Sequence, residues 1–352
     1  MPSDLLPFLK DLASLPGLSV HDNPVRDRIR REWDPLVDEI RTSRLGNLHG
    51  IKHGSSPGPR SQVLISAPMD AIRLMVVEIV DGCLRLQGIG GLDPRTLLGL
   101  PVVVHGLRAL PGTIVRAPEG SPAPSAGEGA PTLEHLLVDV GLPPRQVNRY
   151  VQPGHIVTFA FAPFPLGEDY LAGQSLSTRA PVAALTACLL ELQRRSHLWD
   201  VVAVATVDEG EAFGAALTSA YVFQPDIAIA VGSANGQPPG GAQHQGFALG
   251  KGPANGWGPS IHPGIHREIQ RAAQREEIEL VEEIMPVLSG TDAEGLQTAR
   301  AGIPTGAIGI PIRYRHSSIE VVALPDIRRT GRVLASFVTG LTSDFAKTLS
   351  WD

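Results

Sequence analysis

The sequence predicts an α/β protein whose mostly parallel, twisted sheet carries helices on both faces and is interrupted by a β-rich insert. Three observations predict this class. Short, almost wholly apolar runs recur along the chain, as in strands that are buried on both faces. Segments with helical character alternate with these runs, as in a parallel sheet. Between about residues 72 and 164 the pattern changes to short strands separated by glycine and proline.

Composition narrows the class of protein. Of the 352 residues 43% are hydrophobic and only 5% aromatic, so the core must be mainly aliphatic. A formal net charge of −6 argues against a nucleic-acid partner, which needs a basic face. Cys83 and Cys188 lie in apolar stretches without a C-x-x-C motif, so we expect free thiols in a reducing compartment. We find no signal peptide or membrane span and expect a cytoplasmic protein without a membrane partner.

The N-terminal part predicts two helices, a hairpin and a strand. Apolar residues at helical spacing predict a helix over 5–15. The stretch 23–40 begins Asn-Pro, which favours a helix with the asparagine as its cap and the proline in its first turn. Alternation over 38–54 around a Gly-Asn pair predicts a hairpin. The apolar run 61–68 predicts a buried strand of a parallel sheet.

The alternation of helix and strand returns after residue 173, which predicts the second and larger part of the sheet. The predicted helices are 179–195, 212–223, 262–278 and 326–345, and the predicted strands are 200–210, 226–234, 279–286 and 304–314.

The middle of the chain predicts a separate unit. Residues 117–131 are of low complexity, which predicts a flexible, exposed loop. We expect a discontinuous α/β domain formed by residues 1–68 and 166–352, with an inserted β-rich domain over residues 69–165.

The ends of the predicted strands indicate where a site would form. In an open parallel sheet, ligands bind beyond the carboxyl ends of the strands. Those ends fall at residues 68–70, 208–211, 232–234 and 313–316. A further segment, SGTDAEG, places Asp292 just before a helix.

Eight stretches of the sequence carry a resemblance to a known family: RLGNL, APMDAIRLMV, GIGGLDPRTLLG, SLSTRAPVAALTACLLEL, TVDEGEAFGAA, PDIAIAV, SGTDAEGLQTARAGIP and IPIRYRHSSIEVV. Along nearly the whole chain they resemble the tetrahedral, glutamyl-type aminopeptidases, which are co-catalytic zinc metallopeptidases. The resemblance implies a zinc-aminopeptidase-like fold. It also implies self-association, as a dimer through the inserted domain or as a larger particle up to a dodecamer.

Several ligand positions of that family are substituted here. The family has a histidine two residues before the acid in a stretch like Ala-His-Met-Asp. This chain has Pro68 there, so Asp70 resembles the acid that orients a histidine now missing. The family's bridging aspartate lies two residues before an arginine and aligns with Ser177, before Arg179. Its later acid, in a stretch like Ile-Ala-Val-Asp, aligns with Gly232.

Other positions of the resemblance are retained or ambiguous. Glu209 matches the general base, here vestigial, and Gly210 stands at the next ligand position. This segment is about one residue short, so Glu211 could shift into the ligand position. His316 matches a ligand that is kept, and Asp292 matches a kept acid near the site.

The retained set is too small for two metal ions. A co-catalytic pair needs about five or six protein ligands, mostly anionic, because the two cations repel each other. The chain offers His316 and, with the shift, Glu211. We therefore expect no cofactor, and zinc or cobalt only if an atypical site forms.

Simpler roles are open for the same residues. His316 alone is more often structural than a ligand, Glu209 could be a solvated carboxylate, and Asp292 could cap the helix that follows it. Asp70 could pair with a nearby arginine.

Three arginines are predicted to line the pocket. A pocket that loses cations while keeping acids should gain arginine. Arg73 stands where the family usually has glycine, and Arg179 and Arg313 adjoin the strand ends, where either could pair with Asp70.

Two further motifs have simple interpretations. His262 and His266 lie one turn apart at a predicted helix start, but the motif lacks the glutamate of a zinc-peptidase helix, so we interpret them as exposed histidines. Ser177 lies in a partial nucleophile-elbow motif. It could form a triad with His316 and Asp292 only if the three meet in space.

Three functions follow from these observations. The first is a metal-free, non-catalytic member of the family, acting as a structural, regulatory or peptide-binding protein that associates with itself or with an active paralogue. The second is a metal-dependent aminopeptidase, cleaving N-terminal peptide bonds, with an atypical or single-metal site. The third is a metal-independent serine hydrolase that uses Ser177 and His316.

Overall fold

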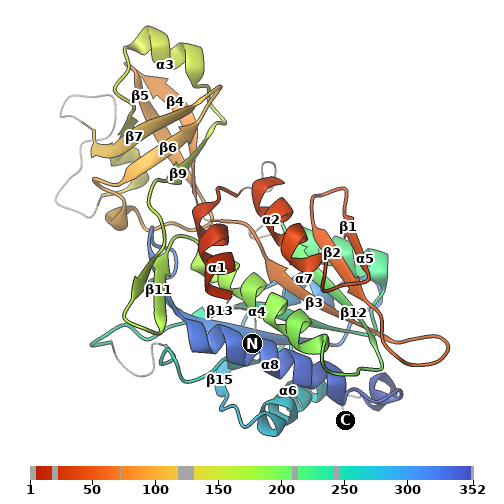
Figure 1. Cartoon of the computed structure of the whole chain (residues 1–352). Coiled ribbons are helices and arrows are strands. Elements are labelled where there is room, and N and C mark those ends of the chain that lie inside the picture. Colours follow the sequence, from red (N-terminus) through yellow and green to blue (C-terminus); the bar gives the residue numbers. More distant parts are fainter. Residues whose placement is uncertain are drawn as a thin grey trace.

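The chain folds into a large sheet covered by helices and a small closed barrel. The computed structural model describes residues 5–17, 23–71, 73–117, 131–207, 213–241 and 246–349. Within these residues eleven strands form one sheet, and a second set closes into the barrel. Figure 1 shows the barrel as a separate lobe above the helix-covered sheet. The predicted class, an α/β sheet with a β-rich insert, is confirmed.

The strands of the large sheet are, in spatial order, β1 (Glu39–Thr42), β2 (Leu48–Lys52), β12 (Asp200–Thr206), β3 (Gln62–Pro68), β13 (Ile227–Asn235), β16 (Thr305–Arg313), β17 (Glu320–Ala323), β11 (Tyr170–Gly173) and β10 (Phe164–Leu166), with β14 (Ala254–Trp257) and β15 (Val281–Ile284) branching from β16. The four central strands, β12, β3, β13 and β16, are parallel, whereas antiparallel pairs flank them. Parallel strands are typically covered on both faces, which explains their apolar sequences.

Helices cover both faces of this sheet. One face carries α1 (Leu5–Ser14), α2 (Asn23–Trp33), α4 (Leu176–Leu192), α6 (Pro263–Arg275) and α8 (Leu324–Gly340), and the other carries α5 (Gly214–Phe223) and α7 (Ala293–Gln297). Successive residues of β3 belong to different cores. Ile65 packs in the core beneath α4 and Leu64 in the core beneath α5, and both are fully buried.

The barrel is built from β4 (Arg73–Val80), β5 (Cys83–Ile89), β8 (Leu136–Asp139), β7 (Ala109–Arg116), β6 (Pro101–His105) and β9 (Ile156–Phe159). It has an aliphatic core of its own. A short helix, α3 (Pro144–Tyr150), lies at the end remote from the sheet (Figure 1). Most of the low-complexity loop, residues 118–130, lies outside the described residues. The domain limits at residues 69 and 165 stay a prediction.

Three expectations need correction. The helix predicted over 23–40 ends at Trp33, and residues 39–42 form β1. Pro35 explains the difference, because the residue before a proline disfavours helical torsion angles. Helix α4 begins at Leu176, before the predicted start, and keeps Pro181 inside it. Several short elements were not predicted: α3, β11, β14 and β17.

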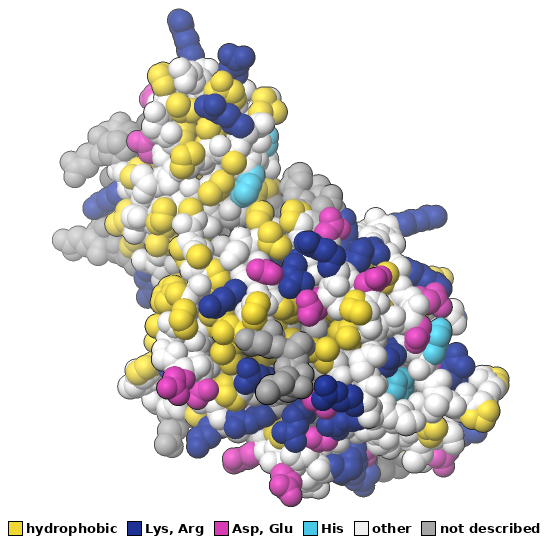
Figure 2. Space-filling model, in the orientation of Figure 1, with side chains coloured by type: hydrophobic (Ala, Val, Ile, Leu, Met, Phe, Trp, Pro, Cys, Tyr) yellow, Lys and Arg dark blue, Asp and Glu magenta, His cyan; other side chains and the backbone are white. Residues whose placement is uncertain are grey.

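The surface and the cysteines agree with the composition. Figure 2 shows basic and acidic side chains intermixed over this face of the larger lobe. None of the described helices combines the length and the apolar character that crossing a bilayer requires. Cys83 and Cys188 are free thiols, and burial raises the pKa of Cys188.

Candidate functional site

The carboxyl ends of the parallel strands come together around Thr206. Pro68 lies beside Thr206 in the register of β3 and β12, and the Met69 N–H donates to the Thr206 carbonyl over 2.8 Å. The Thr206 hydroxyl donates to the Asp292 carboxylate over 2.9 Å. Asp292 precedes α7, but its side chain makes no capping hydrogen bond to that helix. The interpretation of Asp292 as a helix cap is therefore wrong.

Asp70 lies beside the start of α4. It is only 3% exposed, and its carbonyl accepts a hydrogen bond from the Thr178 hydroxyl. Thr178 is fully buried and lies between Ser177 and Arg179 in the chain. The start of α4, which contains the position aligned with the family's bridging aspartate, therefore contacts the backbone of Asp70.

Glu320 is a buried acid that the sequence analysis missed. It opens β17, has no exposed surface, and accepts a hydrogen bond from the Ser177 N–H over 2.7 Å. Burial raises the pKa of Glu320 to about 7, although hydrogen bonds from the backbones of Ser177 and His316 oppose that rise. The available signal was a single acid inside the apolar run IEVVAL, because buried acids are rare unless they have partners.

His316 connects the sheet to the barrel. Its residue adopts a left-handed backbone with φ of 64°, and its carbonyl accepts a hydrogen bond from the Asp93 N–H over 2.8 Å. The ring packs beside Gly91 and forms hydrogen bonds with the backbones of Gly90 and Gly91. Desolvation lowers the pKa of His316, and the neighbouring Arg315 lowers it further. The residue aligned with a metal ligand thus contacts the barrel.

Two of the three predicted pocket arginines are fully enclosed. Arg73 opens β4 and is 2% exposed, and Arg179 in α4 is 0% exposed. A guanidinium stays charged in proteins, so each burial requires acceptors or negative charge nearby. Arg313 differs, because it is only half-buried and its Nε donates to the Gln237 carbonyl over 2.7 Å.

The space beside Gly232 is already filled. A Cβ atom at this position of β13 would lie 3.1 Å from the Thr291 Cγ2 methyl. The Thr291 hydroxyl contacts the Ser289 hydroxyl at 2.9 Å, so the residue is tied to its own loop. An acid at position 232 would therefore require Thr291 to move. The sequence alone could not have shown this contact.

The structure describes only the residues that flank the segment with the predicted general base. Glu209, Gly210 and Glu211 lie outside the described residues. The residue just before that segment, Val207, donates its N–H to the Asn47 side-chain oxygen over 3.0 Å. Asn47 is fully buried and also donates to the Ala215 carbonyl over 2.8 Å. It therefore joins the hairpin of β1 and β2 to both ends of the segment.

The described side chains do not make up a ligand set for two cations. Pro68 and Gly232 offer no side-chain donor, and Ser177 offers a neutral hydroxyl. In the part of the chain that the structure describes, no three His, Cys, Asp or Glu side chains are grouped so that they could hold a metal ion.

The residues of the suggested serine triad are not joined to one another. Across the described ranges, no hydrogen bond links the Ser177 hydroxyl to His316 or Asp292. The Ser177 N–H donates a hydrogen bond to Glu320. The His316 ring forms hydrogen bonds with the backbones of Gly90 and Gly91. The serine-hydrolase function stays a prediction, and no contact described here favours it.

His262 and His266 are buried, so their interpretation as exposed histidines is wrong. His262 caps α6 by accepting the Gly264 N–H over 3.1 Å. His266 Nδ1 lies 2.8 Å from the Gly256 carbonyl, and its ring packs against Trp257. Both histidines therefore have local structural roles at the start of α6.

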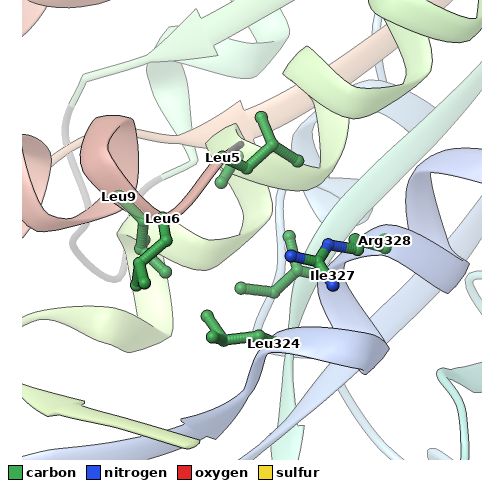
Figure 3. A pocket seen from close by; sticks show the side chains of 7 residues that line it. Leu5, Leu6, Leu9, Leu324, Ile327 and Arg328 are labelled. Atoms are coloured by element: carbon green, nitrogen blue, oxygen red, sulfur yellow. The ribbon is translucent and has the colours of Figure 1, made fainter. Parts of the chain in front are cut away.

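A small pocket lies away from the strand ends. It is lined by Leu5, Leu6, Leu9, Ala183, Leu324, Ile327 and Arg328, from α1, α4 and α8 (Figure 3). Figure 3 shows the aliphatic side chains around the opening and the Arg328 guanidinium at one side. The lining lacks the converging acids, bases or nucleophiles that a catalytic site needs.

Comparisons with known proteins agree with this architecture. The profile of M42 glutamyl aminopeptidases matches residues 46–333. A lysyl aminopeptidase of Pyrococcus furiosus is 30% identical, over 92% of this chain and 93% of its own length. An aminopeptidase structure from Desulfurococcus kamchatkensis superposes with a TM-score of 0.89 at 29% identity, covering 99% of this chain and 98% of its own. The PhTET1 dodecamer superposes with a TM-score of 0.81 at 25% identity, covering 96% and 100%.

Proposed function

The chain belongs to the M42 glutamyl aminopeptidase family, and on that premise we propose that it is a member that has lost the paired-metal site. Its function is then non-catalytic: structural, regulatory or peptide-binding. The observation that carries the proposal is the chemistry of three aligned ligand positions, which hold Pro68, Ser177 and Gly232. None of these side chains is anionic, and a Cβ atom at position 232 would lie 3.1 Å from the Thr291 methyl, so a side chain there requires a small shift of Thr291.

Charge supports the same proposal. Asp70 and Glu320 are buried beside the start of α4, and buried acids require compensation. In a two-metal enzyme the cations would supply it. Here Arg73, which stands where the family usually has glycine, supplies a buried permanent positive charge in this region. A guanidinium does not polarise a water molecule as a metal does, so it replaces the charge of a cation and not its hydrolytic chemistry.

The alternative function is an aminopeptidase with a single-metal or atypical site. The retained acids favour it, since Asp70 and Asp292 keep their places next to β3 and β12. Such a site would draw on His316, Glu209 and Glu211, and zinc or cobalt would supply the activated water.

Metal content distinguishes the two functions. We expect the protein, purified without chelator and dialysed against micromolar zinc and cobalt, to hold close to no metal per chain by mass spectrometry. We also expect it to cleave no aminoacyl-nitroanilide substrates. One or two tightly held ions per chain would contradict the proposal. So would activity that survives purification and falls in Glu209→Gln.

We also propose that the chain self-associates, because the similar PhTET1 structure is a dodecamer. Light scattering on the purified protein is expected to give a mass that is a multiple of 37.3 kDa. A mass of a single chain, unchanged across protein concentration, would contradict self-association. A mixed particle with an active paralogue would appear instead as co-purification of a second, related chain.

A further inference from the structure

The outer side of β15 is an open sheet edge. Among the described residues, β15 pairs only with β14. The Val281 N–H donates to the Pro253 carbonyl over 3.2 Å, and the Met285 N–H donates to the Trp257 carbonyl over 2.8 Å. Backbone groups alternate in direction along a strand, so those of Glu282 and Ile284 point away from β14. They are available to a further strand.

Apolar side chains continue this edge. Ile284 is 61% exposed, and Val287 and Leu288 just beyond it are each 73% exposed. Trp257, 39% exposed, lies opposite Ile284 in the parallel register, so the two side chains share one face. Large apolar side chains grouped beside an open edge are typical of a docking surface.

Acidic side chains make this edge of the sheet negatively charged. Glu277, Glu279 and Glu282 are exposed along the same stretch of chain. Glu282 also lies 3.5 Å from His266 Nε2, and its side chain is 56% exposed. A segment that pairs with β15 would therefore be favoured by Lys or Arg side chains.

The same charges disfavour a second copy at this position. Two β15 strands side by side would bring the exposed acids of both chains together, and like charges on paired strands are destabilising. A foreign segment with basic side chains avoids that cost.

We propose that β15 accepts, as an added strand, an extended polypeptide segment that carries basic and apolar side chains on one and the same face. Main-chain bonds to Glu282 and Ile284 would supply affinity, and pairing beside Glu282 and Trp257 would supply selectivity. The proposal does not depend on the loss of the metal site, because the β15 edge contains none of the aligned ligand positions.

The test is a fluorescence-anisotropy titration of the full chain with a labelled peptide of two Lys-Ser-Val-Ser repeats, which places lysine and valine on the same face of a strand. We expect saturable binding that a peptide of two Glu-Ser-Val-Ser repeats does not show. Ile284→Pro removes one outward N–H and is expected to weaken binding at least about fivefold. Glu282→Lys keeps the backbone and is expected to weaken it at least about threefold. Glu134→Lys, an exposed acid of the barrel, is the matched control and should leave affinity unchanged.

Several results would overturn the proposal. They are absence of binding, equal affinity for a peptide of two Lys-Val-Ser-Ser repeats, which places lysine and valine on opposite faces, or unchanged affinity in both β15 variants. A fall in the mass of the unliganded protein on Ile284→Pro would mean that a second copy covers the edge. If Ile284→Pro fails to fold by circular dichroism, Glu282→Lys decides the outcome. None of these results bears on metal content, so failure here leaves the proposed function standing.

Discussion

Replacing Arg73 with methionine is expected to lower the free energy of unfolding by about 3–5 kcal/mol. The side chain is 2% exposed, so the folded state must hold compensating acceptors or negative charge around it. Methionine keeps most of the volume and removes the charge, which leaves those groups buried and uncompensated. Urea unfolding followed by circular dichroism at neutral pH measures the loss. Added zinc should not reduce it, because the proposal leaves no ligand set to bind the ion.

Arg85 on β5 is the matched control for this substitution. It belongs to the same hairpin, its side chain is 25% exposed, and it lies 3.5 Å from Glu78, whose side chain is 57% exposed. Arg85→Met is expected to change stability by less than about 1 kcal/mol. Equal losses for the two variants would contradict the role of buried charge. Recovery of Arg73→Met by zinc would count against the proposed loss of the metal site.

Replacing Glu320 with leucine is expected to cost about 1–3 kcal/mol of stability. The substitution leaves the buried N–H of Ser177 without its acceptor, and an unsatisfied buried group costs about that much. Glu320→Gln is the control, since its amide oxygen can still accept. Chemical unfolding of the three proteins provides the comparison. A glutamine variant as unstable as the leucine variant would show that this hydrogen bond is not the cause.

The dependence of the folded state's stability on pH provides a second test of the role of Glu320. Burial raises the pKa of Glu320 from 4.5 to about 7. The folded state therefore binds the proton more tightly, and stability falls as pH rises from about 4.5 to about 7. This change amounts to about 3 kcal/mol and levels off above pH 7. Glutamine does not titrate, so the stability difference between wild type and Glu320→Gln should change by that amount across the window. A constant difference would contradict the burial of a titrating acid.

The large elements could be predicted from sequence because their burial leaves a periodic signature. The largely apolar β3 and β12 require cover on both faces, and the structure provides it. The predicted ends of elements were wrong where one residue outweighed the periodic pattern of apolar residues, as Pro35 did after α2. The burial of His262 and His266 was missed for a different reason. A polar residue can be buried when a local carbonyl or N–H satisfies it, and periodicity carries no information about that.

The grouping of several predicted residues at the strand ends was predictable, and the contacts that each of them makes were not. The rule for strand ends brought Asp70 and Asp292 close to Thr206, and the resemblance directed attention to Ser177. The partners that decide the chemistry are remote in sequence: Thr291 over Gly232, and Glu320 beside Ser177. Such contacts depend on which side chains the closed fold brings together, which a single sequence without an alignment does not specify.

The position of the barrel in the chain bears on how the sheet assembles. β3 and β12 are adjacent in the sheet, where Leu64 pairs with Val202, yet the whole barrel lies between them in sequence. Joining them requires closing a long loop, and the entropic cost of closure grows with the length that is still flexible. Contacts within the barrel join residues much nearer in sequence, such as Val80 and Cys83. A barrel that closes first turns this stretch into a compact spacer, so the barrier to sheet formation depends on the order of the two events.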